Sequence, residues 1–393
     1  MEDYPAMLPL VPTIQHYDWG GHTFIPHLAG LKEPSTKPCA EWWIGAHHKA
    51  PSKLFLHGRH LALDEAIAEY PEYLLGREVN THHHTKLPFL LKVLDVASML
   101  SIQTHPSKAQ AEHGYIRENT QGLPLEATQR VFKDDNHKPE LMVALSDFYL
   151  LSGFRTPEQW ASIRKEIPEL QTLPVYKNPQ DLKTLYQEVM TWGKTKIATW
   201  ADRLKKRLDG VILTDKQHPD YWVQKALTLY GADPGLCSVY LLQLRHLSPG
   251  EGYFQGPGVL HAYLEGQNVE IMANSDNVFR GGLTSKHVDV DLLLEHVHYD
   301  YQDNGLTLPK TLLSGMMEYP VPVNEFRLLR VPDDHQFYPW TSSGPSILLP
   351  IQGQSAVRFG EYIRRLPPGQ VEYVLPGEHI ELQSAGDFFL ASI

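Results

Sequence analysis

Two polar side chains stand two residues apart at the end of an apolar run, in the stretch SIQTHP, residues 101–106. Side chains at positions i and i+2 of a strand point to the same face, so the amide of Gln103 and the imidazole of His105 can converge on one point. An isolated pair of this kind is most often a polar strand end that faces water. Whether the pair does chemistry therefore depends on what the rest of the chain brings to it.

Two further segments carry metal-binding side chain types at the mouths of predicted strands. The run DDNHKPEL, residues 134–141, places Glu140 before an apolar strand, and GPGVLHAYLEG, residues 256–266, places His261 just after a tight turn. Two imidazoles, one carboxylate and one amide oxygen make a mixed nitrogen and oxygen set that suits a borderline divalent ion such as zinc. Such a set leaves room for a water or substrate oxygen, which predicts a catalytic site.

A fourth segment, residues 264–290, adds charged side chains. It contains Glu270, Asp276, Arg280 and Lys286. The two glycines that follow Arg280 let the backbone come close to a ligand. A segment this mixed can also be an ordinary polar loop, so its meaning depends on the other motifs.

The composition limits the classes of protein that can hold this set. The chain has 393 residues, 42% of them hydrophobic, which is ample for two or three packed domains. The two cysteines, Cys39 and Cys237, give no disulfide framework, so we expect a cytoplasmic protein. We expect no signal peptide, because the first residues are acidic where such a peptide needs basic ones, and no membrane span, because no apolar run is long enough. The formal net charge of -11 argues against a nucleic-acid partner.

The sequence pattern of the segments that would position these residues changes twice along the chain. Residues 1–154 contain apolar runs typical of buried strands, such as LPFLLKVLDVASML and ELMVALSDFYLLSGF. Residues 155–235 are predicted to be helical, beginning with Thr156 as N-cap, Pro157 at the first helical position and Gln159 completing a capping box. After this helical segment, the sequence again shows the pattern of strands and turns. We therefore predict a mainly β fold with an inserted α-helical domain.

An internal repeat favours jelly-roll domains. The segments 247–266 and 366–386 each carry two Pro-Gly pairs at the same eight-residue spacing. A turn, a strand of about six residues and another turn is the rhythm of a β-sandwich or jelly roll, although two such pairs can also match by chance. In this register His261 aligns with Ile380, so the later copy is expected to pack without holding a metal.

Six blocks of the sequence, taken together, resemble type I mannose-6-phosphate isomerase. They are QHYDWGG, EWWIGAHH, LPFLLKVLDVASMLSIQTHPSKAQAE, DDNHKPEL, HAYLEG and NSDNVFRGGLTSKHVDV, in the family's order and at similar spacings from about residue 13 to 300. The C-terminal module fits more loosely. Two blocks depart from common forms: EWWIGAHH stands where an ELWMGAHP-like run is usual, and FRGGLTSK where VRAGLTPK is common. Neither departure changes a predicted ligand or Arg280.

The resemblance implies a zinc-dependent aldose-ketose isomerase, built of cupin-like jelly rolls with a helical domain, that interconverts mannose 6-phosphate and fructose 6-phosphate. The implied ligands of its zinc ion, one per chain, are Gln103, His105, Glu140 and His261. The active-site arginine falls on Arg280 and the active-site lysine on Lys138. The proton-transfer base stays open between Lys138, His137 and Glu270.

Each implied residue has a chemical reason to be present. Moving a hydrogen between C1 and C2 of a sugar needs a base for a carbon-bound proton and stabilisation of the enediolate charge, for which zinc and Arg280 are suited. Like charge nearby should lower the pKa of Lys138, as an amine base requires. We expect Asp276 to help open the sugar ring.

The remaining expectations concern the substrate, the partners and the domains. Residues expected to hold the phosphate or line the pocket are Lys92, Ser101, Lys286, Trp19 and Glu41. The catalytic jelly-roll region would comprise 1–154 with 236–310, the helical insert 155–235, and the C-terminal jelly roll without metal 311–393. We expect a monomer whose partner is a small-molecule sugar phosphate, with no membrane association.

Two other function classes fit a cupin-like fold with a mixed metal site. An iron or manganese dioxygenase would have no need of Arg280 and Lys138, and a sugar-binding regulator without catalysis would be expected to have lost a ligand or Arg280. The remaining polar groups are predicted to do no chemistry. The histidines of THHHT at 81–85 are expected in a solvated loop and the basic cluster 205–207 on a solvated helix face, while His47, His48, His57 and His60 are expected to be surface or structural residues.

Overall fold

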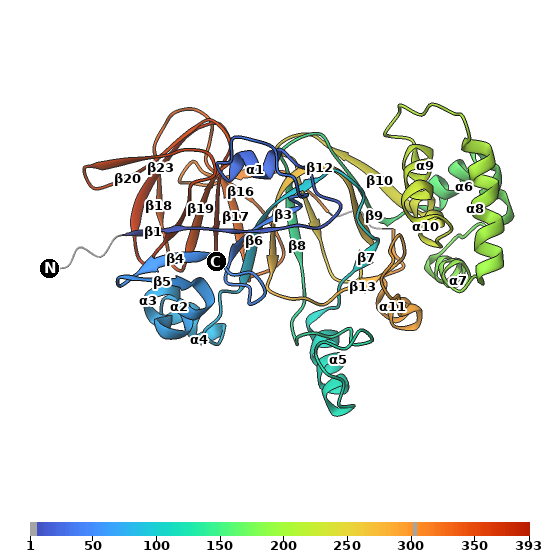
Figure 1. The fold of residues 1–393 in the computed structure, drawn as a ribbon, viewed down its shortest axis with the longest axis horizontal. Helices are drawn as coiled ribbons and strands as arrows, with labels where there is room; N and C mark the ends of the chain where they lie inside the picture. Colours follow the sequence, from blue (N-terminus) through green and yellow to red (C-terminus); the bar gives the residue numbers. More distant parts are fainter. Residues whose placement is uncertain (1–5, 302–304) are drawn as a thin grey trace.

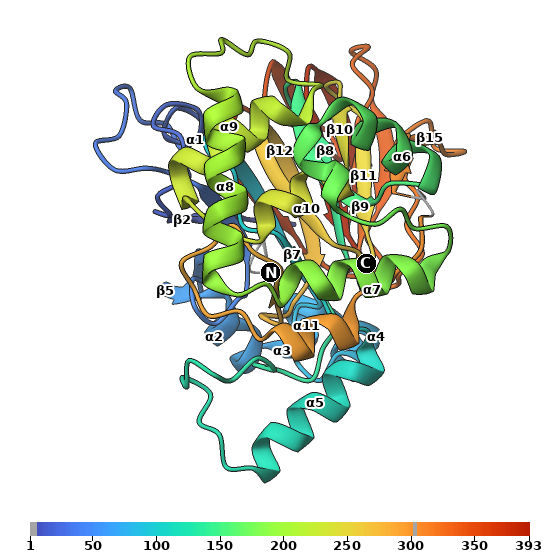
Figure 2. The same ribbon diagram turned by 90° about the vertical axis from the view of Figure 1, so that its right-hand side faces the viewer.

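The computed structural model of the chain describes residues 6–301 and 305–393. Two β-rich bodies lie side by side, and a group of helices covers the far end of the central one (Figure 1). Seen from that end, the helices stand in front of the central strands (Figure 2). The fold is mainly β with a helical insertion, as predicted.

The central body is an eleven-stranded antiparallel sheet, called here the catalytic sheet. Its strands are β2 (Thr13–Gln15), β3 (Glu41–Gly45), β6 (Phe89–Val96), β7 (Gln103–Thr104), β8 (Glu140–Ala144), β9 (Phe148–Phe154), β10 (Leu242–Leu247), β11 (Gly252–Gln255), β12 (His261–Ala273), β13 (Phe279–Arg280) and β14 (Leu306–Thr307). The main path runs β14-β11-β8-β12-β6-β3-β2, and β7, β9, β10 and β13 join it through β12. Strand β12 is therefore the centre of the sheet.

Strand β12 bends between its two halves. The half from Gly266 onward pairs with β6 and β8, whereas the half that starts at His261 pairs with β7 and β9. At the bend Gly266 has a φ of 131°, and a Cβ there would lie 2.6 Å from a ring carbon of Phe148, so the position needs glycine. In the half from Gly266 onward, Met272 pairs opposite Glu140 of β8. The bend lets this half face the half that carries His261.

Side chains of the catalytic sheet alternate between two cores, as period-two patterning requires. On β6, Leu91 and Val93 pack toward the C-terminal body, while Leu94 and Val96 face the interior of the curled sheet. The interior core consists of Leu94, Val96, Met142, Ala144, Phe148, Leu150, Leu247, Tyr253 and Tyr263. In the same alternation, Lys92 and Glu140 occupy positions whose side chains point to the interior of the curled sheet. These charged residues therefore lie inside.

The C-terminal body is a two-sheet sandwich. Its strands are β1 (Met7–Leu10), β15 (Lys310–Thr311), β16 (Met317–Tyr319), β17 (Arg327–Arg330), β18 (Tyr338–Thr341), β19 (Ser346–Pro350), β20 (Gln354–Phe359), β21 (Tyr362–Leu366), β22 (Val371–Val374), β23 (His379–Ala385) and β24 (Phe388–Ser392). The sheet orders are β1-β22-β19-β24-β17-β16-β15 and β18-β23-β20-β21. Strand β1 thus belongs to this body, not to the region 1–154 that was expected to be catalytic, because it pairs with β22.

The predicted turn, strand and turn rhythm is present in both segments. Gly250 and Gly258 flank β11, and Gly369 and Gly377 flank β22, all four with φ between 76° and 88°. Each enclosed strand has four residues, shorter than the six expected. Ile380, which aligns with His261, is buried in the sandwich core.

The helical block packs on the outer face of the catalytic sheet. It comprises α6 (Pro157–Glu166), a 3₁₀ helix at Pro168–Thr172, α7 (Pro179–Met190), α8 (Lys194–Leu208), α9 (Pro219–Tyr230) and α10 (Gly235–Leu241). Thr156 caps α6 as predicted: its Oγ1 accepts the N–H of Gln159 at 3.3 Å, and Gln159 Oε1 accepts the N–H of Thr156 at 2.8 Å. One continuous apolar core joins these helices to Ile102, Leu151 and Phe279 of the catalytic region.

The prediction of a solvated helix face at 205–207 is wrong for one residue. Arg207 turns inward to ion pairs with Glu169 at 2.8 Å and Asp220 at 2.5 Å. Lys205 and Lys206 are exposed, as expected. The helical repeat places the third basic residue on the inner face, beside carboxylates that lie far away in the sequence.

The remaining elements surround the catalytic sheet. They are α1 (Phe24–Leu28), α2 (Leu63–Glu69), α3 (Pro71–Leu75), α4 (Arg77–His82), α5 (Lys108–Thr120), α11 (Val290–His296), β4 (Lys53–Leu56) and β5 (Arg59–Ala62). Of the THHHT histidines, predicted to lie in a solvated loop, one ends α4 and the other two lie in the following turn, and two of the three are exposed. Within the described ranges, no helix combines the length and the apolar character that crossing a membrane requires.

Candidate active site

The four predicted metal ligands meet inside the catalytic sheet. Gln103 lies in β7, His105 directly after it, and Glu140 and His261 are the first residues of β8 and β12. His105 Nε2 is 3.5 Å from Glu140 Oε1, and His261 Nε2 is 3.4 Å from Glu140 Oε2. The side-chain amide nitrogen of Gln103 is 3.5 Å from His261 Nε2, and a half-turn of that amide puts its oxygen there.

These separations fit a single small cation. Zinc binds imidazole nitrogen and carboxylate oxygen at about 2.0–2.2 Å in a tetrahedral arrangement, whose ligand atoms lie roughly 3.4 Å apart. His105, Glu140 and His261 are all buried and form a group able to hold a metal ion. The donor atoms are therefore already spaced as a bound ion would require.

Hydrogen bonds orient both imidazoles toward the same point. His105 Nδ1 lies 2.7 Å from the carbonyl oxygen of Asn277, and His261 Nδ1 lies 2.9 Å from that of Val259. Each Nδ1 donates its proton to a carbonyl, which leaves the Nε2 lone pair for a metal. His105 Nε2 and Glu140 Oε2 are buried without a hydrogen-bond partner, a costly state that a cation would relieve.

The protonation states also suit metal binding. Burial, assisted by the charge of Lys138, lowers the pKa of His105 to about 4, so its ring is neutral at pH 7. Burial alone would raise the pKa of Glu140, but Lys138 and His105 hold it well below its usual value. A neutral imidazole and an ionised carboxylate are the forms that bind a metal.

A cavity of about 830 Å³ opens beside the ligand cluster. Gln103 and Glu140 reach its wall, so a bound ion would be in contact with a small molecule inside it. Most of the other predicted site residues also line this cavity: Trp19, Glu41, Lys92, Ser101, Lys138, Glu270, Asp276, Arg280 and Lys286. The structure thus brings together residues that are spread over most of the chain.

Lys92 is charged, and two carboxylates balance it. Its Nζ lies 3.0 Å from Glu270 Oε1 and 3.5 Å from Glu41 Oε2. Tyr263 donates its hydroxyl to the other oxygen of Glu270 at 2.7 Å. Although burial opposes it, the two glutamates raise the pKa of Lys92, while burial raises the pKa of Glu270. Lys92 therefore fixes these carboxylates and brings little net positive charge to a ligand.

The two neighbouring candidates for the base point in different directions. Lys138 lines the cavity, and its Nζ lies 3.1 Å from Glu140 Oε1. His137 is not among the described residues that line the cavity. Its Nε2 instead pairs at 2.6 Å with Glu325 of the C-terminal body. The sequence could not place this partner, because Glu325 lies almost two hundred residues away.

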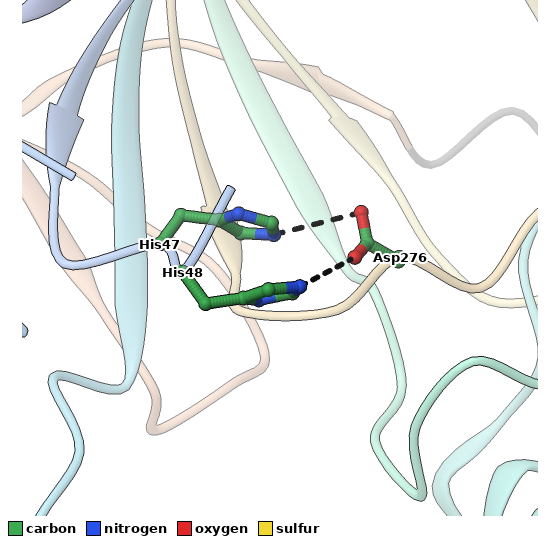
Figure 3. A group of neighbouring side chains, drawn as sticks. All are labelled: His47, His48 and Asp276. Carbon is green, nitrogen blue, oxygen red and sulfur yellow. Dashed lines mark ion pairs between the residues drawn. The ribbon is translucent and has the colours of Figure 1, made fainter. Parts of the chain in front are cut away.

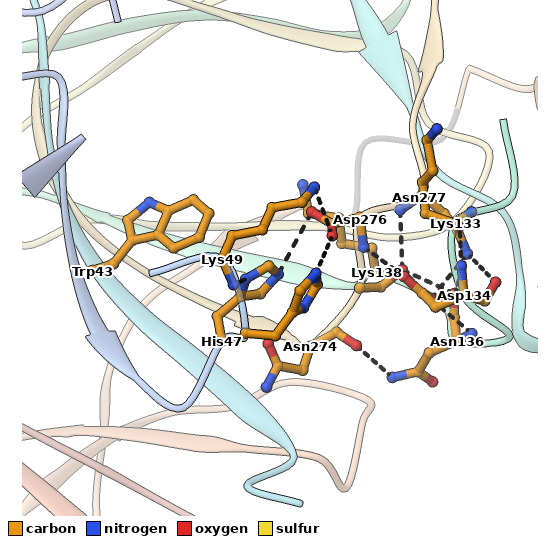
Figure 4. A network of polar contacts seen from close by, with 12 residues as sticks. Trp43, His47, Lys49, Lys133, Asp134, Asn136, Lys138, Asn274, Asp276 and Asn277 are labelled. Atoms are coloured by element: carbon orange, nitrogen blue, oxygen red, sulfur yellow. Dashed lines mark hydrogen bonds and ion pairs between the residues drawn. The ribbon is translucent and has the colours of Figure 1, made fainter. Parts of the chain in front are cut away.

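Asp276 stands in a network of polar contacts that the sequence did not reveal (Figure 4). Its carboxylate pairs with His47 at 3.5 Å and with Lys49 at 2.9 Å. Burial alone would raise the pKa of Asp276, but bonds from His47 and Lys49 hold it well below its usual value. His47 was predicted to be structural or surface, and nothing in its local sequence indicated a partner in the 270s.

The backbone around Asp276 is held by a second carboxylate. Asp134 accepts the backbone N–H of Asp276 at 2.7 Å and the hydroxyl of Ser275 at 2.8 Å. Asn277 receives the N–H of Lys133 at 2.7 Å and donates its own amide to the carbonyl of Asp134 at 2.9 Å. Because the Asn277 carbonyl also orients His105, the same loop fixes a predicted metal ligand and the residue predicted to help open the sugar ring.

Two cations in the cavity wall remain open to a ligand. Arg280 sits opposite Gln103 in the pairing of β13 with β7, and it forms no ion pair with any described residue. Burial lowers the pKa of Arg280, and burial together with the charge of Arg280 lowers the pKa of Lys286. Two uncompensated positive charges beside a polar cavity favour an anionic ligand.

Comparison with known proteins gives one consistent result. Residues 7–157 match the family described as phosphomannose isomerase type I, catalytic domain. The mannose-6-phosphate isomerase of Salmonella typhimurium is 32% identical over 94% of this chain and 94% of its own length. That of Rattus norvegicus is 34% identical over 89% of this chain and 88% of its own.

A solved structure extends the likeness to three dimensions. The crystal structure of the Salmonella typhimurium isomerase, bound to fructose 6-phosphate and zinc, superimposes with a TM-score of 0.88 at 31% identity and covers 99% of both chains. The match with this structure extends over nearly the whole chain, including the helical block and the C-terminal body. The chain therefore belongs to the type I phosphomannose isomerase family.

Proposed function

We propose that the chain is a mannose-6-phosphate isomerase, which interconverts D-mannose 6-phosphate and D-fructose 6-phosphate. The observation that carries the proposal is the buried group of His105, Glu140 and His261 beside a cavity with open cations, in a chain similar over 94% of its length to such an enzyme. The reaction of a dioxygenase would not need Arg280 or Lys138. A binder without catalysis would not need a complete ligand set.

We propose that one zinc ion is held by the imidazoles of His105 and His261, the carboxylate of Glu140 and the amide oxygen of Gln103. When bound there, zinc acts as a Lewis acid that stabilises negative charge on substrate oxygens. The chain's own task at this point is to hold the donor atoms in place. The hydrogen bonds that His105 and His261 donate to the carbonyl oxygens of Asn277 and Val259 do part of this task by fixing both rings.

Lys138 is the proposed base that removes the proton from C2 and returns it to C1. Its amine reaches the cavity and touches only the carboxylate of Glu140 among the ion pairs of the described chain. Both oxygens of Glu270 are occupied, by Lys92 and Tyr263. His137 pairs with Glu325 outside the cavity. The geometry therefore favours Lys138 over the other two candidates.

Arg280 and Lys286 are proposed to meet the negative charges of the substrate. Arg280, next to Gln103 in the sheet, suits the charge that develops on the enediolate, because its planar fork can bind two oxygens at once. Lys286 and the Ser101 hydroxyl suit the phosphate. Asp276 stays ionised and can accept a hydroxyl proton during ring opening, while Trp19 and Glu41 complete the wall.

A coupled assay tests the reaction itself. Purified protein, incubated with mannose 6-phosphate, should produce fructose 6-phosphate at a rate proportional to protein concentration. Glucose 6-phosphate and unphosphorylated mannose serve as controls for the sugar configuration and for the phosphate. Absence of product from mannose 6-phosphate with zinc-loaded protein would contradict the proposal.

The fate of the C2 hydrogen tests the proposed proton transfer. Reaction in heavy water should place deuterium in the product, because a base exchanges its proton with solvent during at least some turnovers. The slow variant Arg280→Lys gives the base more time to exchange and should increase the incorporation. Complete retention of the original hydrogen in both proteins would instead favour a hydride shift.

A further inference from the structure

A second group of potential metal ligands lies outside the proposed zinc site. His47 and His48 approach the Asp276 carboxylate from the same side (Figure 3). His47 Nε2 is 3.5 Å from Asp276 Oδ1, and His48 Nε2 is 4.0 Å from Oδ2. The two rings are stacked with centroids 4.7 Å apart, so both Nε2 atoms face the carboxylate. None of the three residues belongs to the first ligand set.

The surroundings give this group an entrance of its own. A cavity of about 440 Å³ is lined by His47, His48, Lys49 and Asp276. Asp276 and Lys49 also line the larger cavity, so they stand in the wall between the two. The side chain of His48 is 72% exposed, whereas that of His47 is 5% exposed, so one ligand is fixed and the other can adjust.

We propose that His47, His48 and Asp276 form a second binding site for a transition-metal ion of the zinc type. Two imidazoles and one carboxylate are the ligand types that zinc prefers, and water from the smaller cavity can complete the coordination.

Binding at this site requires two local changes. Lys49, whose Nζ lies 2.9 Å from Asp276 Oδ2, has to leave the carboxylate because an ion would take its place. The ring of His47 has to hold its proton on Nδ1, which gives up a hydrogen bond of 3.3 Å from the backbone N–H of Lys49. Lys49 is half exposed and lies in a turn, so both changes are small. The second site is therefore weaker than the first.

Occupation of the site takes Asp276 away from the sugar cavity. Because Asp276 lines that cavity, an ion on its carboxylate prevents it from accepting a hydroxyl proton there. We therefore expect excess zinc to slow turnover. This consequence rests on the proposed function, whereas the binding of the ion does not.

Zinc binding to the protein that already holds one zinc tests the site directly. Isothermal titration with zinc alone should show a second, weaker event in the unmodified chain. His48→Gln should weaken that event by on the order of 10-fold or more, since loss of even an outer-shell partner costs a metal site about that much. Lys49→Gln should strengthen it, because the competing ammonium is gone.

The matched control is His60→Gln, which removes another exposed histidine outside the group. Its second binding event should equal that of the unmodified chain. The basal turnover of His48→Gln should be normal, with inhibition shifted to higher zinc concentration. Failure to see a second event, or equal binding by the unmodified chain and His48→Gln, would overturn the site. If turnover is absent throughout, the proposed function fails but the binding result still decides the site.

Discussion

At the scale of single residues, the proposed zinc ligands are expected to differ in how strongly each one retains the metal. His261→Ala removes an imidazole from a buried group, whereas Gln103→Ala removes a neutral amide oxygen, which is a weaker ligand. We therefore expect His261→Ala to lose zinc at a much lower chelator concentration than Gln103→Ala. The measurement is zinc content after dialysis against graded chelator. His246→Ala, at a histidine that pairs with Asp147 elsewhere, is the control, and equal retention in all variants would contradict the assignment.

Arg280→Lys separates a catalytic from a structural role. A structural role would require Arg280 to pair with Asp276 or Glu270, but those carboxylates are held by other residues. We expect turnover per bound zinc to fall by on the order of 10²-fold, because the variant keeps the charge but loses the planar fork. The Michaelis constant should change much less. Near-normal turnover per zinc with a lowered melting temperature would show that Arg280 only supports the fold.

The buried His105 predicts how stability depends on pH. Its folded pKa of about 4 lies below the unfolded value of roughly 6.5, so the unfolded chain binds more protons between these values. Its contribution is fully present above about pH 6.5 and is lost as the pH falls towards 4, by up to about 3 kcal/mol. Urea unfolding of metal-free protein at pH 7 and pH 5 should show a larger loss for the unmodified chain than for His105→Gln. Identical losses would contradict the burial of an uncharged His105.

At the scale of elements, the bend in β12 positions the site. Gly266→Ala would place a Cβ 2.6 Å from the Phe148 ring at a φ that disfavours side chains, so we expect it to lower both stability and zinc affinity. Gly153→Ala is a matched control in β9, since its φ is also positive but no atom lies within 4 Å of the added Cβ. It should lose stability alone. The measurement compares the melting temperature and the zinc retention of the two variants. Unchanged zinc retention in Gly266→Ala would show that the bend does not position the site.

The elements also show what local sequence can and cannot predict. The cap at Thr156, the strands β6, β8 and β9, and the four Pro-Gly turns follow from local patterns, and the structure contains them. The bend at Gly266 left no comparable signal, because a glycine inside a strand pattern can mark several features. The inward turn of Arg207 was missed because its partners lie in other helices.

At the scale of the whole molecule, long-range pairing explains the remaining differences. Strand β1 joins the C-terminal body by pairing with β22, and His137 reaches Glu325 of the same body. The contact of Asp276 with His47 also joins residues that are far apart in the sequence. A single sequence indicates residue types and local periodicity, but it contains no direct record of which distant segments touch. The motif blocks identified the family because their order and spacing needed no such contact.

The central claim is that a single zinc ion in the buried ligand set makes the whole molecule an isomerase. Metal-free protein should be titrated with zinc while turnover of mannose 6-phosphate is measured in the coupled assay. We expect negligible turnover without metal and a linear rise that ends at about one zinc per chain, with His261→Ala remaining inactive over the same range. Full turnover in the metal-free protein, or a rise that His261→Ala reproduces, would contradict the account.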